Sequence, residues 1–222
     1  MGYELDFGAL AQHFGLFLEG TAVTLGLTAV AAILGVVLGI AGAVGRGSRI
    51  KWLRKAIAVY VELIRNTPFI VQMFFIFFGL PSLGLRLSAL QAAALAMVIN
   101  LTAYAIEILR AGLEAVPDGQ REAGRSLGLR PLLLFVLIIL PQALANVYPA
   151  LTGQIVITML ESAVVSQIAV VDLTHVADFI QSRNFRAFET YLAITLIYLA
   201  LAVGLRRLLA YAGRGLYAGR VR

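Results

Sequence analysis

Five polar side chains lie inside two long apolar stretches of this sequence. Asn100 and Thr102 lie in the first stretch, and Gln154, Glu161 and Ser162 lie in the second. An ionised carboxylate at the middle of a bilayer costs about 2.5–3.5 kcal/mol on insertion scales, so we expect Glu161 to face a bundle interior or a wet cavity. A carboxylate beside a hydroxyl accepts hydrogen bonds from ammonium groups. These five residues are therefore our candidates for binding a small amine-bearing solute.

Structural roles are the alternative for each of these residues. Asn100 and Thr102 would also serve to join helices by hydrogen bonds. Glu161 would also pair with Arg65 or close a gate. Gln154 is placed at helical spacing from Glu161, so the two residues are expected on one helix face.

Other kinds of chemistry have few residues available. The chain has no Cys and only two His, His13 and His175, which excludes thiolate metal sites, disulfides and cysteine nucleophiles. We therefore expect no metal and no cofactor in this chain. Glu107 stands three positions before Arg110, a spacing that favours a local ion pair.

The composition indicates a membrane protein. The 222 residues are 60% hydrophobic and 14% charged, with a mean hydropathy of +0.89, which leaves too little polar surface to coat a soluble domain. The net charge of +6 comes from basic residues that flank long apolar runs. A nucleic-acid-binding protein would present them on a soluble face instead. We expect lipid headgroups as the counter-charge and no nucleic-acid partner.

The apolar runs predict an all-α, polytopic membrane protein of about five transmembrane helices. A crossing helix needs about 20 mostly apolar residues, and charge-free runs occupy 21–44, 67–85, 87–106, 131–160 and 190–205. An amphipathic segment from Ala56 precedes the second run and is expected to extend it towards the N-terminus. The fourth is too long for one crossing, so its first part is expected at the interface, with the crossing from Asn146 to about Val171. The fifth extends towards Phe185, because Arg186 and Glu189 near a helix end can snorkel to the headgroups.

The basic residues predict the orientation of these helices. Of the 18 Lys and Arg residues, 14 fall between runs one and two, between runs three and four, or in the C-terminal tail. The other connections hold Arg86, Arg183 and Arg186, and Arg65 lies beside run two. Because positively charged loops stay in the cytoplasm, we expect the N-terminus outside and the C-terminus inside. Met1 to Phe14 contains no Lys or Arg, so no cleavable signal peptide is expected.

A short cytoplasmic helix is predicted at about residues 117–130. Pro117 and Asp118 suit its start, because Asp can cap free N–H groups, and Gly128 suits its C-cap. Such a helix, joined to runs three and four, would dock on a soluble motor and pass movement to the membrane. Its candidate contacts are Arg121, Glu122, Ala123, Gly124, Arg125 and Gly128. The alternative is an ordinary amphipathic loop helix with a glycine stop.

The spacing through this helix resembles the EAA signature of bacterial ABC importer permeases. Glu122-Ala-Gly is followed by three residues, then Gly128, then nine residues and Ile-Ile-Leu-Pro ending at Pro141, with Gly124 in place of the second Ala. The stretch 62–68, reading ELIRNTP, is similar to the polar amino-acid branch of these permeases, which has Gly where Asn66 stands. At 160–163 relatives often show Lys-Asp-Thr-Ser, whereas this chain has Leu-Glu-Ser-Ala. The local site should therefore be more electronegative here.

The resemblance implies a type I importer architecture, with residues 1–222 as a single transmembrane permease domain in the bacterial cytoplasmic membrane. It also implies two ATP-binding subunits that hold ATP and Mg²⁺, a second permease subunit of the same or a related chain, and an extracytoplasmic solute-binding protein. The substrate would be an amino acid of the histidine, arginine, glutamine or glutamate type. The implied function is to form the translocation path and to couple the partners' ATP hydrolysis to alternating access.

Two other classes of function compete with a permease driven by ATP. The chain has no phosphate loop, so it is not an ATPase itself. An ion-coupled secondary carrier for a small polar solute is the main alternative, in which Glu161 would titrate during transport. Such carriers commonly show inverted repeats, and no internal pair is visible here. An intramembrane enzyme would need a nucleophile and base pair that the sequence does not provide.

Overall fold

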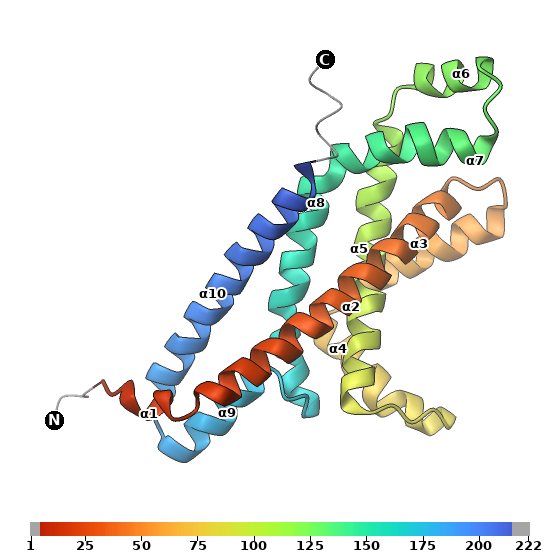
Figure 1. Cartoon of the computed structure of the whole chain (residues 1–222). Helices are drawn as coiled ribbons and strands as arrows, with labels where there is room; N and C mark the ends of the chain where they lie inside the picture. Colours follow the sequence, from red (N-terminus) through yellow and green to blue (C-terminus); the bar gives the residue numbers. More distant parts are fainter. Residues whose placement is uncertain (1–4, 215–222) are drawn as a thin grey trace.

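A computed structural model describes residues 5–214, and the regular structure in that range is entirely helical (Figure 1). The elements, in chain order, are α1 (Gly8–Ala11), α2 (Phe14–Arg46), α3 (Lys51–Arg65), α4 (Phe69–Phe74), η1 (Phe75–Gly79), η2 (Leu80–Leu83), α5 (Ala89–Glu114), α6 (Asp118–Ser126), α7 (Pro131–Leu134), η3 (Phe135–Ile139), α8 (Leu140–Glu161), η4 (Ser162–Ile168), α9 (Leu173–Asn184) and α10 (Ala187–Ala212). The predicted all-α fold is confirmed.

Within residues 5–214, four helical segments are long and apolar enough to cross a membrane. They are α2, α5, the segment Pro131–Ile168 and α10. A fifth crossing requires the pair Lys51–Arg65 and Phe69–Leu83, which are bent by 110° relative to each other. The amphipathic segment from Ala56 therefore belongs to a separate helix, α3, which is not collinear with the helices of the second apolar run. In Figure 1, α7 and η3 run across one end of the molecule before α8 turns along the other long helices.

The break between α3 and α4 follows from the residues at it. The side chains of Asn66 and Thr67 donate hydrogen bonds to the carbonyl oxygens of Glu62 (2.7 Å) and Leu63 (2.9 Å), which closes the last turn of α3. Pro68 has no N–H to continue that helix, and it is the N-cap of α4. The chain consequently changes direction within three residues.

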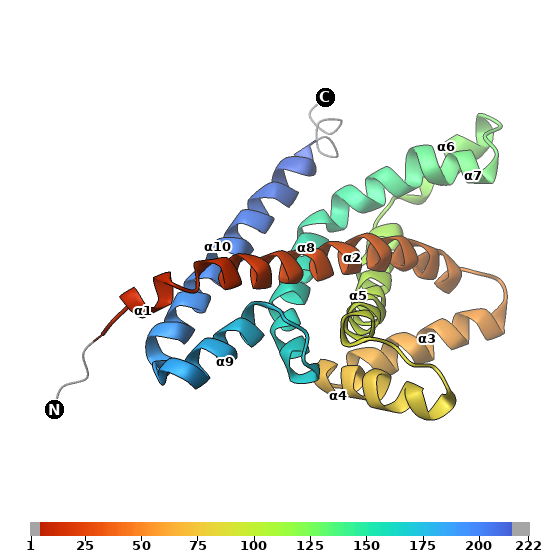
Figure 2. The same ribbon diagram turned by 60° about the horizontal axis from the view of Figure 1, so that its bottom comes forward.

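The centre of the fold is the packing of α2 against α5, while the N-terminal part of α2 runs along α9 (Figures 1 and 2). Gly35 and Gly39 of α2 face Leu101 and Ala105 of α5. A Cβ on Gly39 would lie 2.6 Å from the Cβ of Ala105, so only glycine permits this approach of the two backbones.

Replacing Gly39 by leucine should therefore destabilise the protein by about 1–3 kcal/mol, because overpacking forces α2 away from α5. The measurement is the thermal denaturation midpoint of the detergent-solubilised chain. Gly26→Leu is the matched control, since a Cβ at Gly26 meets nothing within 4 Å. Equal midpoints for the two variants would contradict this packing argument.

Buried polar groups hold the end of the molecule that carries α9. Asp172, which has no exposed surface, accepts hydrogen bonds from the His175 N–H (2.9 Å) and the Tyr198 hydroxyl (3.3 Å). Burial raises the pKa of the Asp172 carboxyl above its ordinary value. Glu189 is also fully buried and pairs with Arg186 at 2.9 Å. The expectation that Glu189 snorkels is wrong, because its partner is in the protein.

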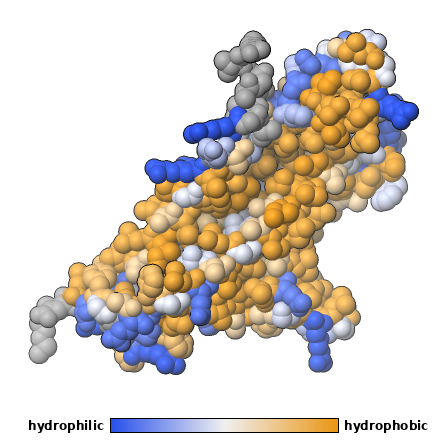
Figure 3. All heavy atoms as spheres, in the orientation of Figure 1, coloured by the Kyte–Doolittle hydropathy of each residue, from blue (hydrophilic) through white to orange (hydrophobic). Residues whose placement is uncertain are grey.

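The connections alternate between two ends of the molecule. The α2–α3 connection, α6 and the end of α10 lie at the upper end in Figure 1, while the N-terminal segment, α9 and the α4–α5 connection lie at the lower end. A broad band of apolar side chains separates the more polar ends (Figure 3). The basic connections named above thus share one end, although Arg220 and Arg222 lie outside the described residues.

Candidate functional site

The helix α6 stands outside the apolar band and has well-defined limits. It ends in a Schellman motif: Gly128 has a φ of 71°, its N–H donates to the Arg125 carbonyl at 2.9 Å, and the Leu129 N–H donates to the Gly124 carbonyl at 3.1 Å. The prediction that Gly128 ends this helix is confirmed, although the C-cap residue itself is Leu127 and Gly128 follows it. The capping role of Asp118 is wrong, because Pro117 is the N-cap and the Asp118 carboxylate instead pairs with Arg121 at 3.1 Å.

One face of α6 packs on the rest of the chain. Gly124 is buried, and a Cβ there would collide with Leu134 of α7. The Arg121 guanidinium donates a hydrogen bond to the carbonyl oxygen of Leu113 in α5 at 2.9 Å. Gln142 of α8 donates to the Gln120 side chain at 3.4 Å. The close approach that Gly124 permits is therefore an internal one, which fixes α6 to its neighbours.

The opposite face of α6 is open. Gly119, Glu122, Ala123 and Ser126 are all exposed, and their spacing puts them on one side of the helix. Three of these four residues are small, so another backbone can approach closely. Leu127, at the end of this face, is 78% exposed. The sequence did not separate this face from the packed one, although its small and polar residues carried the signal.

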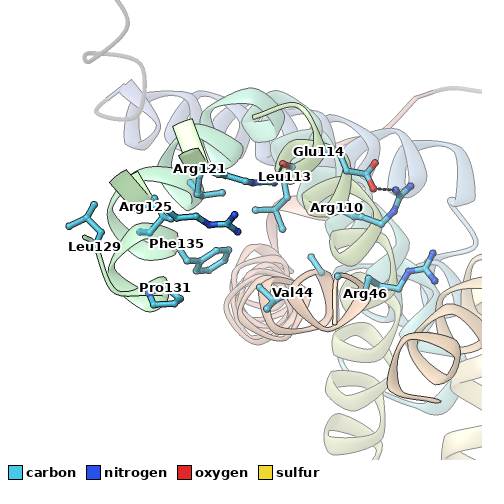
Figure 4. Close-up of a pocket in the computed structure, with 14 residues that line it drawn as sticks. Val44, Arg46, Arg110, Leu113, Glu114, Arg121, Arg125, Leu129, Pro131 and Phe135 are labelled. Carbon is cyan, nitrogen blue, oxygen red and sulfur yellow. Dashed lines mark hydrogen bonds and ion pairs between the residues drawn. The ribbon is translucent and has the colours of Figure 1, made fainter. Parts of the chain in front are cut away.

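A cavity of about 550 Å³ lies on the packed side of α6, between that helix, α7, η3 and the ends of α2 and α5. Figure 4 shows Arg121 and Arg125 extending into it from α6, with Arg46 and Arg110 at the opposite edge. Arg110 is held there by Glu114 at 2.6 Å. The expected ion pair between Glu107 and Arg110 is also present.

Within the apolar band, Asn100 joins two elements. Its amide N–H donates to the Oε1 of Gln72 in α4 at 3.0 Å. Gln72 in turn donates to the carbonyl oxygens of Ile64 (2.7 Å) and Thr67 (3.0 Å), so this pair braces the α3–α4 break. The buried Oδ1 of Asn100 accepts no hydrogen bond within residues 5–214. Asn100 thus combines a helix-joining contact with a free acceptor, and sequence reasoning gave Gln72 no role.

The other predicted substrate residues lie on α5 and at the junction of α8 with η4. Glu161 is half-buried, and in the described part of the chain its carboxylate has no hydrogen bond or ion pair. The hydroxyls of Ser162 and Thr102 are buried and donate at 2.7 Å to carbonyl oxygens of their own helical segments. Gln154 lies on α8 before Glu161 and is half-buried. None of the hydrogen bonds described for residues 5–214 joins the Asn100 pair to Glu161.

The alternative pairing of Glu161 with Arg65 is absent from the described residues. The Arg65 guanidinium instead lies over the ring of Tyr104, 5.3 Å from its centroid. Glu161 and the Asn100 Oδ1 therefore remain two unsatisfied acceptors. Asn100 lies on α5, and Glu161 lies directly before η4; both α5 and η4 pack against α4. This arrangement suits recognition of a hydrogen-bond donor better than it suits covalent chemistry.

Several apolar crossings, buried acceptors within them, and an external helix with an open face together define a membrane transport subunit. Residues 33–216 match the family model of the binding-protein-dependent transport system inner membrane component. The chain belongs to this family, the permeases of ABC importers. The resemblance noted in the sequence and the predicted type I importer architecture are both confirmed.

Individual relatives place the chain among amino-acid ABC permeases. It is 36% identical to a probable glutamine ABC transporter permease, GlnM of Bacillus subtilis, over 90% of this chain and 93% of that protein. It is 33% identical to the arginine transport system permease ArtQ of the same organism, over 90% and 92% respectively. A crystal structure of an amino acid ABC transporter with histidines superposes with a TM-score of 0.86 at 39% identity, covering 96% of this chain and 99% of that one. An ion-coupled carrier is not favoured by these relatives.

Proposed function

We propose that this permease passes an amino acid across the bacterial inner membrane and that separate subunits hydrolyse the ATP that drives transport. The observation that carries the substrate class is the pair of unsatisfied acceptors in this chain, the Asn100 Oδ1 and the Glu161 carboxylate. The similarity of the chain to glutamine and arginine permeases supports the same class. An α-ammonium group and a donor on the side chain of an amino acid would satisfy both.

The charge of this site favours cationic and neutral polar amino acids over acidic ones. Glu161 is unpaired in the described chain, and Leu160 beside it supplies no positive charge. The side-chain carboxylate of an acidic substrate would be repelled by Glu161. This repulsion costs more free energy in a medium of low dielectric constant than in water. Ser162, Thr102 and Gln154 would complement the two main acceptors.

The open face of α6 is the proposed contact with an ATP-binding subunit. Glu122 offers a charge for orientation, and Gly119, Ala123 and Ser126 allow close approach. On the other face, Arg121 and Gly124 fix α6 to α5 and α7, Arg125 extends into the cavity behind α6, and Gly128 ends the helix so that α7 can follow. A displacement of α6 would therefore be passed directly to two elements of the membrane domain. Hydrolysis would in this way switch the paired permeases between outward-facing and inward-facing states.

The proposed assembly contains two permeases, of this chain or of this chain and a relative, two ATP-binding subunits and an extracytoplasmic binding protein. ATP and Mg²⁺ would bind to the ATP-binding subunits only. The end of the molecule that carries the basic connections and α6 would face the cytoplasm, as positively charged loops do. The N-terminal segment and α9 would then face the binding protein.

The test is the complex of this chain with its ATP-binding subunit and binding protein, reconstituted into proteoliposomes. ATP hydrolysis and uptake are measured with cationic, neutral polar and acidic amino acids in turn. We expect stimulation by a cationic or neutral polar amino acid and none by glutamate or aspartate. Stimulation by acidic amino acids alone would contradict the proposed site, and uptake driven by an ion gradient without ATP would contradict the mechanism.

A further inference from the structure

The cavity behind α6 combines a cationic edge with an apolar wall. Its lining includes four arginines and one glutamate, so the excess charge is positive. The wall is formed by aliphatic and aromatic side chains, among them Leu134, Phe135 and Ile139. A soluble anion would use only the first feature, and an apolar ligand only the second.

The four arginines differ in whether their guanidinium groups already have hydrogen-bond or ion-pair partners within the protein. Arg110 is held by Glu107 and Glu114, and Arg121 by Asp118 and a backbone carbonyl. Arg125, four residues after Arg121 on α6, makes no hydrogen bond or ion pair with any residue from 5 to 214, and its guanidinium extends into the cavity (Figure 4). The buried Nε of Arg46 across the cavity also has no hydrogen-bond partner among these residues. The cationic edge therefore has unused donors.

The surroundings place this cavity at the boundary between lipid and water. Exposed apolar side chains continue from it along α7 and η3, namely Leu132, Leu133, Val136 and Leu137. Val44, which lines the cavity from α2, is 45% exposed. Such a surface would lie against acyl chains, whereas α6 just beyond it is polar. The arginines thus stand at the level of the phospholipid headgroups.

We propose that this cavity binds one anionic phospholipid of the cytoplasmic leaflet. Its phosphate would lie at the α6 edge, where Arg125 donates paired hydrogen bonds with Arg121 beside it, and its acyl chains would follow Phe135 and the exposed face of η3. Basic pockets between helices on the cytoplasmic side are suited to such headgroups. The bound lipid would hold α6 and α7 at the membrane surface. The proposal uses the orientation given above but does not depend on docking of an ATP-binding subunit.

The experiment is native mass spectrometry of the purified full-length chain, without partners, titrated with phosphatidylglycerol or with phosphatidylcholine. We expect a saturable phosphatidylglycerol adduct that phosphatidylcholine does not replace. Arg125→Gln should weaken that adduct about tenfold, as the loss of a charge-assisted hydrogen bond does. Arg130→Gln is the matched control, because Arg130 is exposed in the same connection and does not line the cavity. Equal binding to the two variants would overturn the proposal.

A second pair of variants tests the apolar part without a change in charge. Val44→Trp should fill the cavity from α2 and reduce phosphatidylglycerol binding, whereas Val37→Trp, at an exposed position of α2 outside the cavity, should not. Glycerol 3-phosphate, a headgroup without acyl chains, should not displace the lipid at comparable concentrations. Displacement by it, together with unchanged binding to Val44→Trp, would show a site for a free phosphate and overturn the lipid assignment.

Discussion

Replacing Glu122 by lysine is expected to abolish amino-acid uptake while leaving the permease folded and inserted. Glu122 is exposed on the open face of α6, and no ion pair within residues 5–214 involves its carboxylate. The reversal would therefore act on the contact with the ATP-binding subunit. Losing a charge pair at an interface costs about 2 kcal/mol or more, which corresponds to about a 30-fold loss.

Uptake, substrate-stimulated ATP hydrolysis and copurification of the ATP-binding subunit are the measurements. Arg130→Glu is a charge reversal of equal size in the same connection, off α6, and should leave uptake largely intact. Ala123→Trp provides a second test, because it adds bulk to the open face without changing charge. Gly128→Trp is less informative, since the positive φ of Gly128 means that any side chain there strains the backbone. Full uptake by both Glu122→Lys and Ala123→Trp would refute the docking face.

Replacing Glu161 by glutamine is expected to raise the apparent KM for uptake by about tenfold or more, with a smaller change in the maximal rate. The carboxylate has no partner in the described protein, so its removal leaves no charge unpaired, and the loss reflects a charge-assisted hydrogen bond to substrate of about 1.5–3 kcal/mol. The effect should be larger for a cationic amino acid than for a neutral one.

The measurement is the concentration dependence of uptake, and of ATPase stimulation, for arginine and glutamine. Glu19→Gln is the control, because Glu19 is an exposed carboxylate on α2 that, like Glu161, has no hydrogen bond or ion pair within residues 5–214. An identical KM for every amino acid in Glu161→Gln would remove Glu161 from the substrate site. That result would not bear on the proposed role of α6, which is tested separately with Glu122→Lys.

The two ends of α6 show where local sequence sufficed and where it did not. Gly128 was predicted correctly to end the helix, because the hydrogen bonds of the last turn alone require a residue with positive φ just after the C-cap Leu127. Asp118 was predicted to cap the start and does not, because Pro117 occupies the N-cap position and the carboxylate turns to Arg121 instead. Both helix ends depend on residues within one turn. Only at the start of α6 did two interactions compete for one side chain, because the Asp118 carboxylate could cap the helix or pair with Arg121.

The substrate candidates show the same limit over a longer distance. Asn100 was recognised as a polar residue in an apolar run, but its partner Gln72 lies 28 residues earlier, on a different helix, α4. No periodicity within one segment predicts that contact. Likewise, the sequence left three roles open for Glu161: contacting the substrate, pairing with Arg65 or closing a gate. The position of Arg65 over Tyr104 removed the pairing with Arg65.

The sequence by itself determined the membrane class, the apolar segments, the distribution of basic residues and the glycine that ends α6, because hydropathy and helix ends depend on residues close together in the chain. The tertiary structure alone decided that Gly124 packs on Leu134 while Glu122 stays exposed, and that four arginines from three segments surround one cavity. These features arise from contacts between segments distant in sequence. Their side chains meet only when the helices pack.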